Sequence, residues 1–500
     1  MQAELDNLKN RLAEVDDVEN AAALLEWDQL VMMPPGGAEG RADQTATLQK
    51  IAHEKLVAPE VGRLLDSLSR ELRDRPAEDD DASLVRVAAR RYERKRKIPA
   101  ELVAEMYQAT ALGLQIWAEA RAKNDFPHFL PALERIVDIK QRVAACFPET
   151  ESPYDALLDD YEPGMLTHQV AAMFEELKGT LLPLVKAITA RPPVDDSALR
   201  RDYPEARQLE FSLNIVRQFG YDFNRGRQDL AVHPFCTSFS TGDVRITTRV
   251  LRNYLPTCLM GSMHECGHAL YDQGYPDRFR RSPLAYGASL GIHESQSRLW
   301  ENLVGRSRGF WEFFYPLLQA AFPENLDAVD VDVFYRAINR VHPSYIRVEA
   351  DEVTYNLHTL LRYEMEVALI EGRLAPKDAP EAWNAKYKTY FGQDVPEDRL
   401  GVLQDTHWGG GLIGYFPTYT IGNLVAAQFF AKAMADEPGL RDDFKQGEFG
   451  RLLGWLRQNV HAHGRKYLPA DLVERVTGQP LSAKPYLAYL KQKFGELYRL

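Results

Sequence analysis

Apolar residues recur at every third or fourth position through most of the chain, which is the spacing of one face of an α-helix. In the N-terminal part this pattern predicts helices at 4–27, 40–68 (interrupted near Pro59), 82–97, 99–123, 129–146 and 168–189. Toward the C-terminus it predicts helices at 331–339, 344–371, 380–391, 420–435, 449–460 and 485–497. Only short breaks with proline or glycine separate these segments, and no fixed repeat or low-complexity linker occurs. We therefore expect a mostly α protein that forms one large helical fold over residues 1–500.

Residues 229–250 depart from the helical pattern. The stretch 233–240 contains few helix-forming residues, Thr241-Gly242-Asp243 is typical of a turn, and 244–248 is a run rich in β-branched residues. This pattern predicts a small β-hairpin. An edge strand of such a hairpin can bind an extended polypeptide through main-chain hydrogen bonds, and a purely structural hairpin is the alternative.

Composition and charge narrow the class of protein. Of the 500 residues, 45% are hydrophobic and 26% are charged, as in an ordinary globular protein, and the formal net charge of −12 disfavours nucleic acid as a partner. We expect the basic clusters at 90–97 and 278–281 to be solvated helix faces. There is no long apolar run and no apolar signal core at the N-terminus, so we expect no membrane segment. The four cysteines show no CxxC spacing, which favours reduced thiols and a cytoplasmic location.

The strongest chemical signal is the string His264-Glu265-Cys266-Gly267-His268, within a helix expected over about 256–273. Two histidines four residues apart lie one turn apart on the same helix face, so both imidazoles can bind one metal ion at about 2.0–2.1 Å. Glu265 projects about 100° around the helix from His264 and can act on a water at the metal without being a ligand. This is the H-E-x-x-H arrangement of metal-dependent peptide hydrolases, and an incidental cluster of these residues is the alternative.

A catalytic zinc site needs a third protein ligand. The segment 291–302 is amphipathic and compatible with a helix, and its candidate ligands are His293, Glu294 and Glu301. The pattern alone does not choose among the three. The small residues Gly261 and Gly267 in the first helix would permit the close packing that a buried site requires.

Six strings along the chain resemble the signature set of the M32 metallocarboxypeptidases, the carboxypeptidase Taq group. They are HPF (233–235), DVRIT (243–247), HECGH (264–268), HESQ (293–296), IRVEAD (346–351) and GVLQDTHW (401–408). The resemblance spans almost the whole chain. It implies that Glu294 is the third ligand, that His293 is its neighbour rather than a ligand, and that the protein is a homodimer. The expected metal is zinc, with cobalt as an alternative.

The expected architecture places this site in a deep substrate groove. We expect the helix with His264 and His268 at the floor of the groove and the N-terminal helices along one wall. Residues 229–420 would then carry the active site. Arg298 occupies the position four residues after Glu294, so a carboxylate that supports a histidine ligand must come from Asp272 or from another segment.

A carboxypeptidase must also bind a free α-carboxylate, and Arg347 is our candidate because a guanidinium can hold a carboxylate with two hydrogen bonds. Arg347 also lies near the start of the predicted helix 344–371, where the helix dipole favours anions. IRVEAD and DVRIT are similar to motifs thought to close one end of the groove in the family. Structural ion pairs, Arg347 with Asp351 and Arg245 with Asp243, are the alternative. We expect a substrate role for Arg347 and a structural role for Arg245.

Further substrate contacts are expected around the glycine-rich segment 405–419. His407, Tyr415 and Tyr419 are candidates for stabilising the oxyanion, with ordinary core packing as the alternative for each tyrosine. His233 and Tyr345 are the remaining candidates for substrate binding.

We therefore expect a zinc-dependent exopeptidase that releases C-terminal residues from peptides with a free C-terminus, with Glu265 as general base and then general acid. An endo-acting oligopeptidase with the same zinc chemistry is the second hypothesis. A helical binding scaffold with a structural metal is the third.

Overall fold

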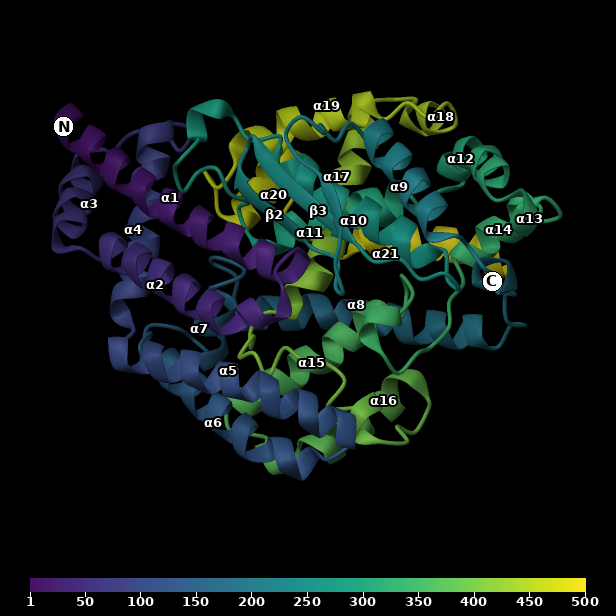
Figure 1. Cartoon of the computed structure of the whole chain (residues 1–500), viewed down its shortest axis with the longest axis horizontal. Helices are drawn as coiled ribbons and strands as arrows, with labels where there is room; N and C mark the ends of the chain where they lie inside the picture. Colours follow the sequence, from purple (N-terminus) through teal and green to yellow (C-terminus); the bar gives the residue numbers. More distant parts are fainter. The chain divides into compact units, whose positions relative to one another are not determined.

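The computed structural model describes residues 1–500 and divides them into two compact units. The first unit contains residues 1–96, 195–338 and 426–480, and the second contains residues 97–194, 339–425 and 481–500. Nearly all regular structure is helical, which confirms the predicted fold class (Figure 1). One fold over residues 1–500 and a deep groove stay predictions.

The first unit holds the N-terminal helices and the helices that follow the sheet. They are α1 (Gln2–Val31), α2 (Ala38–Leu56), α3 (Pro59–Glu71), α4 (Asp80–Lys97), α9 (Glu205–Phe219), α10 (Pro256–Asp272), α11 (Leu290–Arg298), α12 (Arg308–Ala321), α13 (Pro323–Leu326), α14 (Val331–Ile338), α18 (Leu440–Phe444), α19 (Gly450–Asn459) and α20 (Pro469–Thr477). The predicted interruption near Pro59 is confirmed, because α2 ends at Leu56 and Pro59 occupies the first position of α3, where its missing N–H costs nothing.

A three-stranded sheet in the first unit lies next to α10. Strands β2 (Cys236–Ser240) and β3 (Asp243–Thr248) are antiparallel and confirm the predicted hairpin, whereas β1 (Gln228–Leu230) pairs parallel to β3 and was not predicted. The strand order is β1-β3-β2. Val244 and Ile246 of β3 are fully buried, and Figure 1 shows α10 running alongside β3. The hairpin therefore supports the helix that carries the two histidines.

The regular structure of the second unit is all helical. Its helices are α5 (Ala100–Lys123), α6 (Phe126–Ala145), α7 (Pro153–Leu158), α8 (Thr167–Thr189), α15 (Tyr355–Ile370), α16 (Ala379–Phe391) and α21 (Lys484–Tyr498). Helix α17 (Pro417–Asp436) begins in this unit and ends in the first. Helices α5 and α6 lie side by side (Figure 1). None of the protein's helices combines the length and the apolar character that crossing a bilayer requires.

The predicted helix 344–371 is wrong over its first part, because α15 begins only at Tyr355. The carboxylate of Asp351 accepts hydrogen bonds from the backbone N–H groups of His342, Val353 and Thr354 at 2.9, 2.9 and 3.0 Å. These bonds hold the preceding chain in a turn, and only a short 3₁₀ segment forms at Arg347–Glu349. Arg347 therefore does not lie at the start of an α-helix, and the expected contribution of a helix dipole is absent.

Candidate metal centre

Helix α10 carries the HECGH string, and helix α11 packs closely against it. Pro256 begins α10, and Ser289 caps α11 by accepting a hydrogen bond from the backbone N–H of Ile292 at 3.0 Å. A Cβ on Gly267 would lie 2.5 Å from the carbonyl oxygen of Gln296 and 2.6 Å from the Cα of Ser297. Only glycine permits this approach. The close packing expected from the small residues of α10 is thus present at Gly267.

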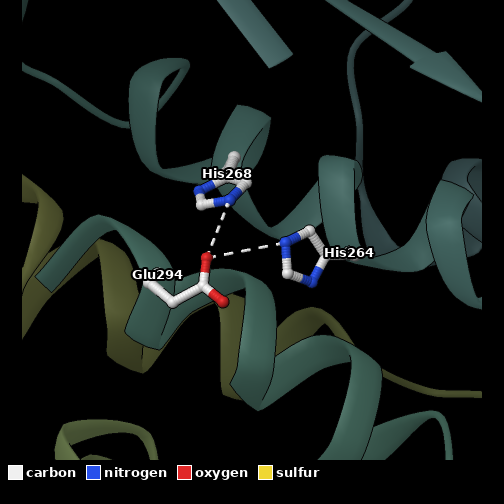
Figure 2. Close-up of side chains that lie close together, drawn as sticks. All are labelled: His264, His268 and Glu294. Atoms are coloured by element: carbon white, nitrogen blue, oxygen red, sulfur yellow. Dashed lines mark ion pairs between the residues drawn. The ribbon is translucent and has the colours of Figure 1, made fainter. Parts of the chain in front are cut away.

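The close approach brings Glu294 of α11 to the two histidines of α10 (Figure 2). Its Oε2 lies 3.6 Å from His264 Nε2 and 3.4 Å from His268 Nε2, and the candidate ligand atoms all lie within 4.8 Å of one another. Four ligands placed tetrahedrally at 2.0–2.1 Å from a zinc ion are about 3.3 Å apart. Two imidazole nitrogens and a carboxylate oxygen at this spacing fit a catalytic zinc ion with one position left for water.

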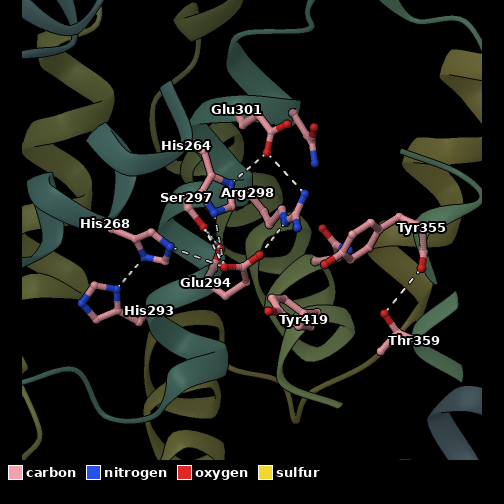
Figure 3. A network of polar contacts seen from close by, with 12 residues as sticks. His264, His268, His293, Glu294, Ser297, Arg298, Glu301, Tyr355, Thr359 and Tyr419 are labelled. Atoms are coloured by element: carbon pink, nitrogen blue, oxygen red, sulfur yellow. Dashed lines mark hydrogen bonds and ion pairs between the residues drawn. The ribbon is translucent and has the colours of Figure 1, made fainter. Parts of the chain in front are cut away.

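Glu301, the second carboxylate considered as a ligand, faces the other side of the His264 ring (Figure 3). It lies on a π-helical turn, Leu299–Val304, that continues α11, and its Oε2 is 2.9 Å from His264 Nδ1. Arg298 also donates to it at 3.3 Å and lowers the pKa of Glu301 to about 2, although burial opposes this shift. The carboxylate therefore fixes the proton on His264 Nδ1 and leaves Nε2 to bind a metal.

His268 is supported by a different arrangement. Its Nδ1 lies 2.6 Å from Nδ1 of His293 (Figure 3). Nε2 of His293 in turn lies 2.9 Å from Oδ1 of Asp272. Asp272 was expected as a possible direct partner of a histidine ligand. In the structure it contacts His293 instead, and His293 stands between Asp272 and His268. His293 itself does not face Glu294 with either ring nitrogen, because both are used in this chain of contacts.

The second oxygen of Glu294 is held by Arg298. The guanidinium Nε donates to Glu294 Oε1 at 2.6 Å. The hydroxyl of Ser297, which donates to the backbone carbonyl of Glu294 at 2.7 Å, also lies 3.2 Å from Glu294 Oε2. Burial would raise the pKa of Glu294, but Arg298 and His264 hold it well below its usual value. The carboxylate is therefore charged and oriented, as a metal ligand must be.

Burial and the neighbouring carboxylates give Glu265 and the two histidines different pKa values. Burial raises the pKa of Glu265 to about 7, which suits a general base near neutral pH. Burial lowers the pKa of His268 to about 4, so its imidazole is neutral. Burial acts in the same direction on His264, but Glu294 and Glu301 outweigh it and raise the pKa of His264 to about 10. Metal binding at His264 must therefore displace a proton.

In the second unit, Arg347 lies in a buried cluster of charges. Its Nε and Nη2 donate to the two oxygens of Asp405 at 3.1 and 2.9 Å, and its Nη1 donates to Tyr355 Oη at 2.8 Å. Arg362 binds the same carboxylate, and the two arginines hold the pKa of Asp405 well below its usual value although burial opposes them. The alternative pairing of Arg347 with Asp351 is wrong. Sequence reasoning missed Asp405 and Arg362, although Asp405 lies within the GVLQDTHW string.

Three of the other substrate-binding candidates surround this cluster. His407 Nε2 lies 3.3 Å from Tyr419 Oη, the rings of His407 and Tyr415 are 5.4 Å apart, and the Arg347 guanidinium lies 4.9 Å from the centre of the Tyr419 ring. Tyr345 instead stacks on Tyr387 at 5.4 Å. Four candidates of the second unit therefore lie together: Arg347, His407, Tyr415 and Tyr419. The ring of Tyr345 contacts Tyr387 instead.

His233 and Arg245 belong to the first unit. His233 is exposed in the loop before β2, where the neighbouring Pro234 packs against Gly261 of α10. Arg245 forms the expected ion pair, donating to both oxygens of Asp243 at 2.8 Å, and its guanidinium lies 4.3 Å from the centre of the Trp27 ring. The structural role predicted for Arg245 accounts for all of these contacts.

Comparison with known proteins decides the family. The family model described as "Carboxypeptidase Taq (M32) metallopeptidase" matches residues 7–494. The chain belongs to the M32 family of metallocarboxypeptidases. It is 44% identical to "Thermostable carboxypeptidase 1" of Thermus thermophilus over 99% of each chain. A crystal structure of the M32 carboxypeptidase from Deinococcus radiodurans R1 is 44% identical, with a TM-score of 0.96 and full coverage of both chains.

Membership of the M32 family establishes the general activity of the protein. The protein is a metallocarboxypeptidase that acts on peptides and uses a metal cofactor, so the scaffold hypothesis is dropped. The Apo-Mg structure of the Pyrococcus furiosus carboxypeptidase is similar over 98% of this chain and 99% of its own, at 36% identity and a TM-score of 0.95.

Proposed function

We propose that this M32 enzyme is a zinc-dependent carboxypeptidase in which His264, His268 and Glu294 hold the metal. The observation that carries the proposal is the convergence of these three side chains, with ligand atoms within 4.8 Å of one another. Two histidines and one glutamate form the ligand set of well-known catalytic zinc sites, and cobalt is the alternative ion. Each ligand is also held from behind by a second hydrogen bond, which is typical of a functional metal site.

Glu265 is proposed as the general base and then the general acid. A zinc ion held by the three ligands would lower the pKa of its water toward about 7 and polarise the scissile carbonyl. Glu265 adjoins His264 in α10 and is only 6% exposed, and a pKa raised to about 7 lets it take a proton from the attacking water at neutral pH. The same carboxyl group then delivers this proton to the departing amine.

For the free α-carboxylate of the substrate we propose Arg347. A guanidinium has five N–H donors, and the contacts to Asp405 and Tyr355 use three of those of Arg347. Two donors are left for a second carboxylate, and Asp405 holds the group in place. His407, Tyr415 and Tyr419 lie around it and are proposed as further substrate contacts. His233 and Tyr345 are the remaining residues proposed for substrate binding.

The test compares N-blocked dipeptides with free and with amidated C-termini, before and after metal removal and with zinc or cobalt added back. The proposal expects cleavage of the free form only, lost with a chelator and restored by the metal. Glu265→Gln should lower kcat by about 10²–10⁴-fold while bound metal stays unchanged. Equal cleavage of free and amidated substrates would instead support the endopeptidase hypothesis.

Arg347→Ala tests the carboxylate site separately. Loss of a charged hydrogen-bonding partner costs about 1.5–3 kcal/mol, so the preference for a free C-terminus should fall by roughly 10–100-fold. Arg245→Ala is the matched control, because Arg245 is engaged with Asp243 and should leave this preference unchanged. A homodimer, a cytoplasmic location and one groove-containing fold over residues 1–500 complete the proposal. Light scattering of the purified protein tests the dimer.

A further inference from the structure

We propose that Asp272 and His293 form a relay that fixes the tautomer and the ring orientation of His268, so that His293 is a positioning residue of the metal centre. The inference rests on the proposed metal site and extends it. It starts from an asymmetry between the two histidines. His264 is backed directly by the carboxylate of Glu301 at 2.9 Å, whereas a second imidazole stands between His268 and its nearest supporting carboxylate.

The hydrogen bonds of the relay are consistent with only one arrangement of protons when all three groups are in their ordinary charge states. Asp272 accepts at 2.9 Å from Nε2 of His293, so the proton of a neutral His293 lies on Nε2. Nδ1 of His293 then carries a lone pair. The group that faces it at 2.6 Å, Nδ1 of His268, must be the donor. His268 is thereby left with a lone pair on Nε2, the atom that faces Glu294 at 3.4 Å.

The ring of His293 packs closely against Tyr271 and Gly287. The ring of Tyr271 lies 5.3 Å from the centre of the His293 ring, and a Cβ on Gly287 would lie only 3.0 Å from its Cδ2. Asp272 and His268 belong to α10, whereas His293 belongs to α11, so the relay also joins the two helices that supply the ligands. A rotated His293 would break both of its hydrogen bonds.

The chemical consequence is that Asp272 acts on the metal ligand without touching it. A carboxylate that accepts directly from a histidine ligand strengthens it as a donor. Through His293 the same carboxylate selects the tautomer of His268 without contacting the ligand itself. Removal of His293 should therefore weaken metal binding more than neutralisation of Asp272, because His268 Nδ1 then loses its only acceptor.

The test measures zinc affinity by competition with a chromophoric chelator. His293→Phe keeps the ring but removes the acceptor, and we expect the Kd for zinc to rise about 10–100-fold. Asp272→Asn should raise it less, by roughly 3–10-fold. The two changes should not add, because Asp272 acts only through His293: the double variant should bind zinc as His293→Phe does. His463→Phe and Asp277→Asn are the matched controls outside the relay and should leave the Kd unchanged.

A second measurement separates a relay from a merely structural effect. In zinc-loaded protein with ¹⁵N-labelled histidine, long-range ¹H–¹⁵N spectra should show the proton of His268 on Nδ1 and that of His293 on Nε2. Asp272→Asn should convert His293 to a mixture of tautomers. His293→Gln offers an amide oxygen to His268 and should restore zinc affinity, with no further effect of Asp272→Asn.

Three results would overturn the relay: an unchanged Kd in His293→Phe, additive effects in the double variant, or a proton on Nε2 of His268 in the zinc-loaded protein. Failure of the proposed function has a different signature. In that case the unsubstituted protein binds no zinc, or Glu265→Gln keeps full activity, whatever the variants of His293 and Asp272 do.

Discussion

Gly267→Ala should separate the two helices of the metal centre. The new Cβ would lie 2.5 Å from the carbonyl oxygen of Gln296 and 2.6 Å from Cα of Ser297. Carbon atoms normally approach other heavy atoms to about 3.5 Å, so α11 must move by about 1 Å. Both obstacles are backbone atoms, and no side-chain rotation relieves the collision. Glu294 lies two residues before Gln296 in α11 and must move with it.

The expected magnitude follows from the geometry of the ligands. Glu294 Oε2 now lies 3.4 and 3.6 Å from the two histidine nitrogens, close to the roughly 3.3 Å of a tetrahedral site. Metal–ligand distances tolerate only about 0.2 Å, so a shift of about 1 Å removes the third ligand. We expect at least a ten-fold weaker Kd for zinc, or about 1.4 kcal/mol. Overpacking costs about 1–3 kcal/mol and better helix propensity returns about 1 kcal/mol, so the apoprotein should lose only roughly 0–2 kcal/mol.

Gly261→Ala is the matched control in the same helix. The nearest atoms to a Cβ on Gly261 lie at 3.6 Å, which is an ordinary contact. This variant should gain up to about 1 kcal/mol of stability and keep its zinc affinity. Zinc competition and the visible spectrum of the cobalt-substituted protein report the site, and urea unfolding reports stability. The reasoning is refuted if Gly267→Ala binds zinc within about two-fold of the unsubstituted protein and shows the same cobalt spectrum.

Two further predictions concern Glu301, which lies behind His264, and the buried His461, whose Nε2 lies 3.0 Å from Oε1 of Gln296 in α11. Glu301→Gln removes the charge that faces His264 Nδ1 at 2.9 Å and should weaken zinc binding by roughly 10–100-fold in the same competition assay; an unchanged Kd would deny Glu301 this role. Burial lowers the pKa of His461 to about 3, so the folded protein keeps this ring neutral while the unfolded chain takes up a proton below about pH 6.5. The stability tied to His461 is thus present above pH 6.5 and declines by about 1.4 kcal/mol per pH unit as the pH falls toward 3. His461→Gln should lack this slope in urea unfolding between pH 7 and 5, and equal slopes in both proteins would contradict the assignment.

The parts of the site that lie within one element could be predicted from the sequence. Residues 264–268 need only a helix to place both imidazoles on one face, and α10 spans Pro256–Asp272 against an expected 256–273. The hairpin was equally accessible, because a turn and a run of β-branched residues are local signals. β1 was not, since three residues paired in parallel with a distant strand leave no periodic pattern.

Contacts between elements were beyond the reach of the pattern. Glu294 and Glu301 are both carboxylates on one amphipathic segment. Which of them faces Nε2 of the histidines depends on how closely α11 packs on α10 and on the π-helical turn after Arg298. Helical spacing also gave no sign that 344–354 is held in a turn, because the side chain that holds it, Asp351, acts through backbone hydrogen bonds.

Gly267 belongs to the local sequence pattern of α10 and also determines how closely α11 packs on α10. Its position in the string HECGH is a local fact, whereas its effect is to set the distance between two helices and thereby the position of Glu294, the proposed third ligand. A larger residue there would keep both histidines, the proposed general base Glu265 and the helix, and would still displace Glu294. The H-E-x-x-H pattern alone therefore cannot indicate a complete metal site. The residue directly before the second histidine, Gly267 here, also has to be compatible with the backbone of the helix that carries Glu294.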